Sequence, residues 1–135
     1  MRKGGRISAA DLMVVKPGGV FAVERPDPPA ELSADEAHEW RCVVNRMPAD
    51  WFPRETHPLL IQFCRHTVIA RHLAQLIKAC ESERELDMRQ YGELLKLHAN
   101  EGRAMSSLAT RMRVSQHAQY NIQKKTGSSI EKPWK

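Results

Sequence analysis

Three polar side chains that could bind a metal ion or move a proton interrupt apolar helical patterns: His66, His98 and Glu101. Imidazole and carboxylate groups are zinc ligands in many sites and general acids or bases in many enzymes. Two histidines and one glutamate at this spacing match no established ligand motif, and the other four histidines do not cluster at ligand spacing. Buried polar residues also fix the register of packed helices through hydrogen bonds. We expect that structural role here, with no metal and no cofactor.

The sequence contains none of the short motifs that mark common enzyme classes. It has no phosphate-binding G-x-x-x-x-G-K-[ST], no dinucleotide fingerprint, no H-E-x-x-H and no nucleophile elbow. The three cysteines, Cys42, Cys64 and Cys80, lie in apolar helical patterns without C-x-x-C spacing, which indicates small hydrophobic residues in a reducing compartment. No segment is typical of a signal peptide or a membrane span. We therefore expect a soluble cytoplasmic protein that is not an enzyme.

Basic residues gather toward both ends of the chain. The net charge of +5 divides into +3 for residues 1–16, −4 for the middle and +6 for residues 103–135. Basic ends on an acidic body favour a polyanionic partner such as nucleic acid, although basic tails can also serve only solubility. The candidate DNA-binding residues are Arg2, Lys3, Arg6, Arg103, Arg111, Arg113, Lys124 and Lys125.

Two heptad stripes predict the helices that would position these groups. The first comprises Leu59, Phe63, His66, Ala70, Leu73, Ile77 and Cys80; the second comprises Tyr91, Leu94, His98, Glu101, Met105, Leu108 and Met112. Steps of three and four place each set on one face of a helix. When the first set is read backwards and the second forwards, the two residue numbers of each pair sum to 171, as those of Cys80 and Tyr91 do. Residues 57–82 and 87–114 are thus predicted to form an antiparallel helical hairpin with arms roughly 40 Å long.

A further helix is predicted over residues 33–47, before the hairpin. Ser33 and Glu36 form a capping box, in which each side chain can accept the other residue's backbone N–H, and Pro48 ends the helix. We expect an all-α chain with a basic, proline-rich flexible arm at 1–31, a helical oligomerisation domain at 32–122 and a flexible basic tail at 125–135. The oligomerisation domain ends in a short helix over 115–124.

The first half of the helix at 57–82 is apolar on the side away from the hairpin seam as well. That side carries Leu60, Ile61, Cys64 and Val68. A helix that is apolar all round must be buried on both sides, so either the helix at 33–47 or another subunit must cover it. We expect a homo-oligomer, with these four residues, Trp40 and Phe52 as candidate interface residues.

One segment favours a different DNA-binding arrangement. Residues 107–120 are similar to the middle of a helix-turn-helix, with Leu108-Ala109 followed by Val114-Ser115 and a polar stretch. Leu108 and Met112 are also needed by the hairpin seam, however. The seam therefore favours a continuous helix to about Val114, and the helix-turn-helix remains an alternative.

The order of motifs from residue 25 to residue 120 resembles that of small terminase subunits of tailed double-stranded DNA phages. The matching residues are Arg25-Pro26, Pro28-Pro29, Leu32-Ser33, Glu36, Trp40, Trp51-Phe52, Phe63-Cys64, Arg71, an acidic turn, Leu108-Ala109 and Arg113-Val114-Ser115-Gln116. The chain departs from the pattern at Ala118-Gln119, because such proteins often have an arginine just before the position of Tyr120.

The resemblance implies a helical protein that assembles into a closed ring, often of about nine subunits. Such a protein binds viral DNA at the packaging start site and hands it to the large terminase subunit, which carries the ATPase and nuclease. Its expected partners are double-stranded viral DNA, the large subunit and copies of itself, with no membrane, in the host bacterial cytoplasm. The alternatives are a helix-turn-helix regulator and a helical-hairpin adaptor with no nucleic-acid role.

Overall fold

A computed structural model describes residues 23–115, and over that range the chain is all-helical. It contains α1 (Ala34–Arg46), a short 3-10 turn η1 (Arg54–Thr56), α2 (His57–Glu81) and α3 (Met88–Arg111). The predicted all-α class is confirmed for these residues. The predicted tail at 125–135, most of the predicted short helix at 115–124 and residues 1–22 of the predicted arm lie outside the described range.

The predicted capping box begins α1. The Ser33 backbone N–H donates to Glu36 Oε2 at 2.9 Å, and the Glu36 N–H donates to Ser33 Oγ at 3.3 Å. Both bonds satisfy backbone donors that the first turn of a helix leaves unpaired. The helix ends at Arg46, since Met47 is extended and Pro48 follows. The predicted bounds, 33–47, differ from the observed ones by one residue at each end.

The segment before α1 corrects the prediction of a flexible arm over its described part, residues 23–31. The Arg25 guanidinium donates to the carbonyls of Val44 and Met47, at 3.4 and 3.3 Å. The Trp40 indole N–H donates to the Pro26 carbonyl at 2.9 Å. This extended segment therefore runs along α1 and is tied to both its middle and its end.

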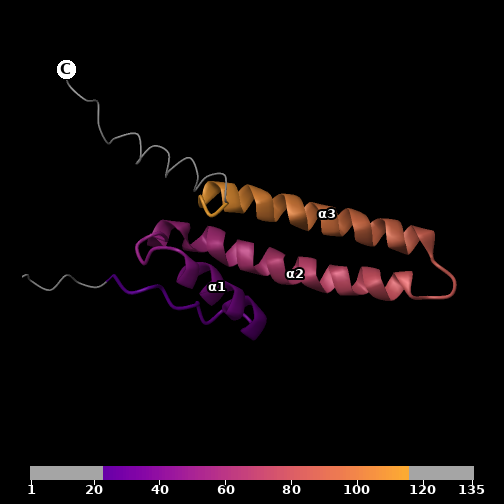
Figure 1. The fold of residues 1–135 in the computed structure, drawn as a ribbon, viewed down its shortest axis with the longest axis horizontal. Coiled ribbons are helices and arrows are strands. Elements are labelled where there is room, and N and C mark those ends of the chain that lie inside the picture. Colours follow the sequence, from indigo (N-terminus) through magenta and orange to yellow (C-terminus); the bar gives the residue numbers. More distant parts are fainter. Residues whose placement is uncertain (1–22, 116–135) are drawn as a thin grey trace, which may run out of the picture.

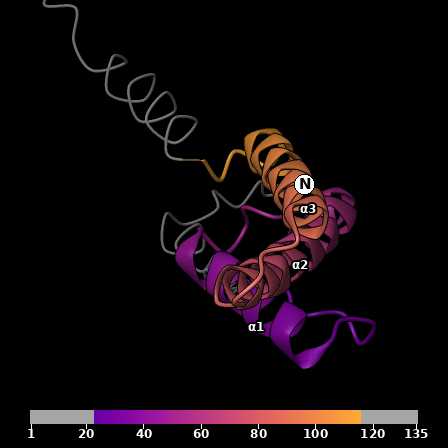
Figure 2. The ribbon, with the colours of Figure 1, turned by 90° about the vertical axis from the view of Figure 1, so that its right-hand side faces the viewer.

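The two long helices run antiparallel and pack along each other (Figure 1). Their connection is the acidic turn that ends at Asp87, whose carboxylate caps α3 by accepting the N–H groups of Arg89 and Gln90 at 3.0 and 3.3 Å. Leu73, Ile77 and Cys80 are buried in the half of α2 nearest this turn. Figures 1 and 2 both show α2 lying between α1 and α3.

The main hydrophobic core lies at the end of the hairpin opposite the turn, which we call the base. It joins all three helices and the loop between α1 and α2: Trp40, Val44, Met47, Phe52, Leu60, Cys64, Leu108 and Met112. Trp40, Leu60 and Cys64 are fully buried, with an exposed fraction of 0%. A side chain removed from water to this degree contributes on the order of 2 kcal/mol.

This core corrects the predicted oligomer interface. Leu60, Cys64, Trp40 and Phe52 are buried inside a single chain, because α1 of that chain covers the outer side of α2. They offer no surface to a second copy. Ile61 and Val68 are only half-buried and remain candidates. Of the two covers that the sequence left open for the outer side of α2, the structure uses the chain's own first helix for Leu60 and Cys64.

Two ion pairs join α1 and the segment before it to α2. Arg71 pairs with Glu39 and Arg65 pairs with Glu31. The Arg71 pair raises the pKa of that guanidinium, chiefly through the hydrogen bond to Glu39. Both arginines are substantially exposed, so these pairs orient α1 more than they stabilise it.

Candidate nucleic-acid interface at the base of the hairpin

The described residues are close to neutral. Residues 23–115 carry thirteen lysines and arginines against fourteen acidic residues, so the basic excess of the chain belongs to residues 1–22 and 116–135. Five of the eight candidate DNA-binding residues lie in those outer segments, outside the described range: Arg2, Lys3, Arg6, Lys124 and Lys125. The other three, Arg103, Arg111 and Arg113, are exposed along the last part of α3 and just after it.

Both ends of the described chain lie at the base. Figure 1 shows the coloured ribbon beginning beside α1 and ending beside the C-terminal end of α3, on the side away from the turn. Both basic outer segments therefore join the described chain at this end of the hairpin, and residues 116–135 follow shortly after Arg113. The acidic turn, with Glu83, Glu85 and Asp87, lies at the opposite end of the hairpin. Arg111 and Arg113 thus lie at the end of the hairpin opposite the acidic turn, in a region that also carries Asp50 and Glu55.

A tight C-terminal cap sets where the chain leaves α3. Arg113 adopts a left-handed backbone with φ 57°. The Arg113 N–H donates to the Thr110 carbonyl at 3.1 Å, and the Val114 N–H donates to the Ala109 carbonyl at 3.0 Å. This is the Schellman arrangement, completed by Val114 packing against the core. It corrects the prediction that the helix continues to about Val114, because α3 ends at Arg111.

Trp51 holds that cap to the loop between α1 and α2. Its indole N–H donates to the Met112 carbonyl at 3.1 Å, across 61 residues of sequence. The Trp51 backbone N–H donates to the Pro48 carbonyl at 3.0 Å, which tightens the loop around the ring. No local pattern in the sequence signals this partner carbonyl, because the bond depends on a distant helix end.

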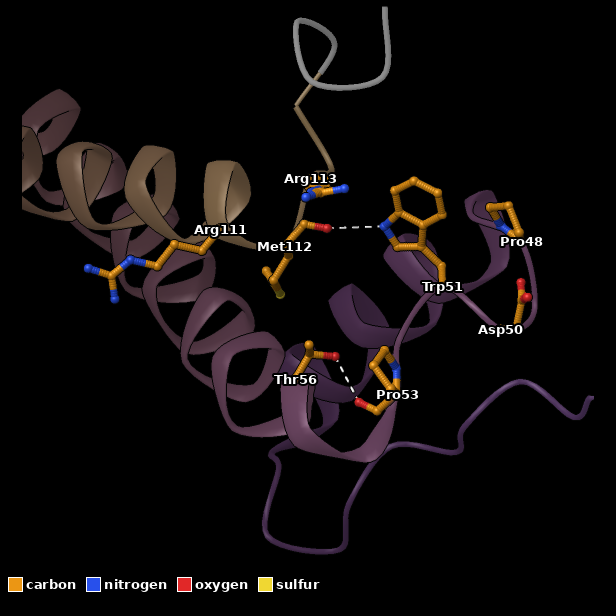
Figure 3. Close-up of a pocket in the computed structure, with 8 residues that line it drawn as sticks. All are labelled: Pro48, Asp50, Trp51, Pro53, Thr56, Arg111, Met112 and Arg113. Carbon is orange, nitrogen blue, oxygen red and sulfur yellow. Dashed lines mark hydrogen bonds between the residues drawn. The ribbon is translucent and has the colours of Figure 1, made fainter. Parts of the chain in front are cut away.

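A shallow pocket of about 470 Å³ opens at this junction (Figure 3). Its lining combines apolar rings with two guanidinium groups and one carboxylate: Pro48, Asp50, Trp51, Pro53, Thr56, Arg111, Met112 and Arg113. In Figure 3 the Arg111 side chain points away from Trp51, whereas Arg113 lies beside it. Guanidinium groups here suit phosphate oxygens.

The polar residues of the hairpin seam are only partly brought together. His66 Nδ1 of α2 and Glu101 Oε2 of α3 form a half-buried hydrogen bond. His98 lies one helical turn before Glu101, and no bond joins it to the pair in the described structure. Among residues 23–115, no group of three histidine, cysteine or acidic side chains is placed to hold a metal ion. The geometry is that of a polar contact fixing the register of two helices.

The cysteines separate into two kinds. Cys64 and Cys80 are buried, and burial raises the pKa of both thiols, that of Cys64 to about 12. A thiol with so high a pKa is a packing group rather than a nucleophile. Cys42 corrects the prediction of three packed cysteines, because it is exposed on α1, with Sγ 3.6 Å from His38 Nε2.

Comparisons with known proteins do not identify a family for this chain. In the part of the chain that the structure describes, no helix has the length and apolarity that a bilayer crossing requires. No protein-family model, curated protein or solved structure matches this chain.

Proposed function

We propose that this chain is the small terminase subunit of a tailed double-stranded DNA phage. In this role it binds viral DNA at the packaging start site and delivers it to the large subunit, which supplies the ATPase and nuclease. The motif order from residue 25 to residue 120 supports the family. The protein would act in the host bacterial cytoplasm as a binding and delivery component, without catalysis of its own.

The observation that carries this proposal is the polarity of the hairpin. Arg111 and Arg113 lie at the base, where both basic outer segments are attached, and the acidic turn lies at the far end. DNA is a dense line of phosphates, so lysines and arginines gathered at one pole attract it, while carboxylates at the other pole repel it. The base is thus the DNA-binding end, and the turn is directed away from DNA.

Assembly gives this weak contact its strength. A single chain offers a few phosphate contacts, which bind with micromolar or weaker affinity at physiological salt. A homo-oligomeric ring of about nine subunits, as the resemblance implies, would present the same pole many times over to one DNA molecule, and its avidity would exceed the single-site affinity by orders of magnitude. The ring would also offer a repeated surface to the large subunit.

The test is a salt titration of DNA binding by fluorescence anisotropy. The double variant R111Q/R113Q is compared with a matched double variant at the turn, R84Q/R89Q, which removes the same charge from the other pole. Each lost phosphate contact lowers the slope of log K against log salt by about 1. We expect the base variant to lower affinity and slope and the turn variant to leave both unchanged. Wild-type protein that shows no salt-dependent binding would refute the proposal.

A helix-turn-helix regulator is the second candidate, because the chain turns sharply after Arg111 instead of continuing. The chain forms a turn over Met112–Val114, and Ser115 follows it. In a helix-turn-helix the turn would fall at this place, between α3 and residues 116–124. Such a regulator predicts a dimer on a palindromic site. It also predicts that changing Gln116 and Gln119 abolishes binding, while changing Arg2, Lys3 and Arg6 does not. A hairpin adaptor without a nucleic-acid role predicts no DNA retention in a gel shift.

A further inference from the structure

The loop between α1 and α2 holds one indole ring firmly beside the cap of α3. Both N–H groups of Trp51 are bonded, the indole N–H to the Met112 carbonyl at 3.1 Å and the backbone N–H to the Pro48 carbonyl at 3.0 Å. Farther along the loop, the hydroxyl and the backbone N–H of Thr56 both donate to the Pro53 carbonyl, at 2.8 and 2.9 Å. The ring and the wall beside it are therefore ordered before any ligand arrives, which lowers the entropy cost of binding one.

Only part of the Trp51 ring is buried. That part packs against the main core, and the rest of the side chain lines the pocket of about 470 Å³ at the base. Ligand pockets in proteins have volumes of ~300–1,000 Å³. The pyrrolidine rings of Pro48 and Pro53 line the same pocket and make it largely apolar. A flat aromatic group of a ligand can stack on an indole ring in such surroundings.

The charged side chains of the pocket are separated from one another. In Figure 3, Arg113 lies on one side of the Trp51 ring, and Asp50 lies on the other. A guanidinium group binds phosphate oxygens through charged hydrogen bonds. A carboxylate repels phosphate but accepts hydrogen bonds from N–H groups. The pocket therefore suits a ligand with an anionic group at one end and an aromatic ring that carries N–H donors at the other.

The left-handed backbone of Arg113 contributes to this arrangement. Because α3 ends at Arg111 and the chain turns at φ 57°, the Arg113 side chain leaves the line of the helix and lies beside Trp51. Arg111, still within the helix, points away from that ring (Figure 3). Backbone strain of this kind in a non-glycine residue is concentrated at functional sites. At Arg113 the strain accompanies a cation held next to an aromatic ring.

We infer that this pocket binds one unpaired nucleotide of a DNA strand, with the base stacked on Trp51 and the phosphate paired with Arg113. Aromatic side chains hold unpaired bases of any sequence in this way. In a duplex each base is covered by its neighbours, so the pocket requires a single-stranded stretch or a base turned out of the stack.

The surroundings of the pocket favour a nucleic-acid strand over other aromatic ligands. Residues 1–22 and 116–135 join the described chain at this end of the hairpin, and each segment carries four basic residues against one acidic residue, a net charge of +3. A basic neighbourhood attracts a polyanion, and a strand continues past the pocket toward both segments. The inference rests on the proposed function, which places DNA at the base, and adds the state of the DNA that this pocket takes.

Photocrosslinking of the full wild-type chain tests the pocket directly. A short single strand carries one 5-iododeoxyuridine, a base that forms a covalent bond with an aromatic side chain on which it stacks when it is irradiated. Peptide mass spectrometry then locates the bond. We expect Trp51 to be the main site, with far less product when the same strand is annealed to its complement. Crosslinks confined to Tyr120 or Trp134, or equal yields from the duplex, would overturn the inference.

Two further arms define the ligand and keep the two proposals apart. By fluorescence anisotropy, Trp51→Ala should weaken binding of the single strand about fivefold or more beyond its effect on a blunt duplex. Trp51→Phe, which keeps a ring that can stack, should recover part of that difference, and circular dichroism checks that both variants remain helical. Equal losses on the two DNA forms would contradict stacking.

Thymidine monophosphate is the competitor that separates a strand from a free nucleotide. The Trp51 crosslink should persist at a large molar excess of the mononucleotide over the strand, and its loss there would assign the pocket to free nucleotides and overturn the inference. Salt-dependent duplex binding without a Trp51 crosslink would overturn the inference and leave the proposed function standing. A Trp51 crosslink without any duplex binding would do the reverse.

Discussion

At the scale of single residues, Arg113 affects both the stability of the base, through its backbone, and the charge of the base, through its side chain. Within the described range it is the one non-glycine residue with a positive φ, a backbone that costs an L-residue about 1 kcal/mol and costs glycine little. Its cation is a candidate phosphate contact. Stability and DNA affinity should therefore respond to its replacement in opposite directions.

Arg113→Gly should raise the free energy of unfolding by about 1 kcal/mol, because glycine relieves the left-handed strain. Arg111→Gly removes the same charge at the last residue of α3 and should lower the free energy of unfolding by at most about 1 kcal/mol. Urea denaturation followed by circular dichroism measures both changes. Equal destabilisation by the two variants would show that the cap does not hold Arg113 in this conformation.

Trp51→Phe keeps an aromatic ring in the loop but removes the N–H that caps the Met112 carbonyl. The loss of one such bond at a partly exposed site should cost about 1 kcal/mol and lower Tm by a few degrees. Trp40→Phe makes the same chemical change in the fully buried core, leaves the Pro26 carbonyl unbonded and should cost more. A larger loss from Trp51 than from Trp40, measured by thermal unfolding, would contradict this ranking.

The three thiols should differ sharply in reactivity. Cys42 is exposed, whereas burial holds the pKa of Cys64 at about 12 and raises that of Cys80. Alkylation requires the thiolate. At pH 8 we expect one thiol to react quickly in the native protein and three after denaturation, and Cys42→Ser should abolish the fast phase. Rapid labelling of Cys64, located by peptide mass spectrometry, would be the contrary result.

At the scale of elements, a local signal predicted the start of α1 well. The capping box of Ser33 and Glu36 acts within three residues of the helix start, so the sequence alone contains both partners. The seam residues likewise repeat within each helix. The end of α3 could not be predicted in this way, because arginine at Arg113 gives no sign of a left-handed cap. Such a cap usually carries glycine.

Contacts between different helices could not be predicted from the pattern within any one segment either. The apolar outer side of α2 required a cover, but periodicity cannot say which helix supplies it. Leu60 and Cys64, which bury against α1, were therefore assigned to a second copy. The anchoring of Arg25 and the bond from Trp51 to Met112 depend on helix ends brought close by the fold. Both findings concern the base, where the candidate site lies.

The contribution of the capping box to the stability of α1 can be tested by a single substitution. Ser33→Ala removes the oxygen that accepts the Glu36 N–H and should cost about 1 kcal/mol. The matched change Ser107→Ala, exposed within α3, should be neutral or slightly stabilising, because alanine is the better helix former. Chemical denaturation compares the two. Indistinguishable midpoints would mean that the cap contributes nothing to the packing of α1 on α2.

At the scale of the whole molecule, different features occupy different parts of the long axis of the hairpin, from the base to the turn. The main core and two described candidate cations, Arg111 and Arg113, lie at the base. The turn carries Glu83, Glu85 and Asp87, and exposed apolar side chains of α2 and α3 lie between the two ends. The proposed function makes one positional claim: DNA meets the base.

Site-specific photocrosslinking tests that claim most directly. Benzoylphenylalanine is placed in the full chain at exposed Thr110, near the base, and separately at exposed Glu85, in the turn. Each protein is irradiated with radiolabelled duplex DNA at low salt. DNA held at the base predicts covalent adducts from position 110, lost as salt is raised, and none from position 85. Adducts from position 85 without any from position 110 would contradict it.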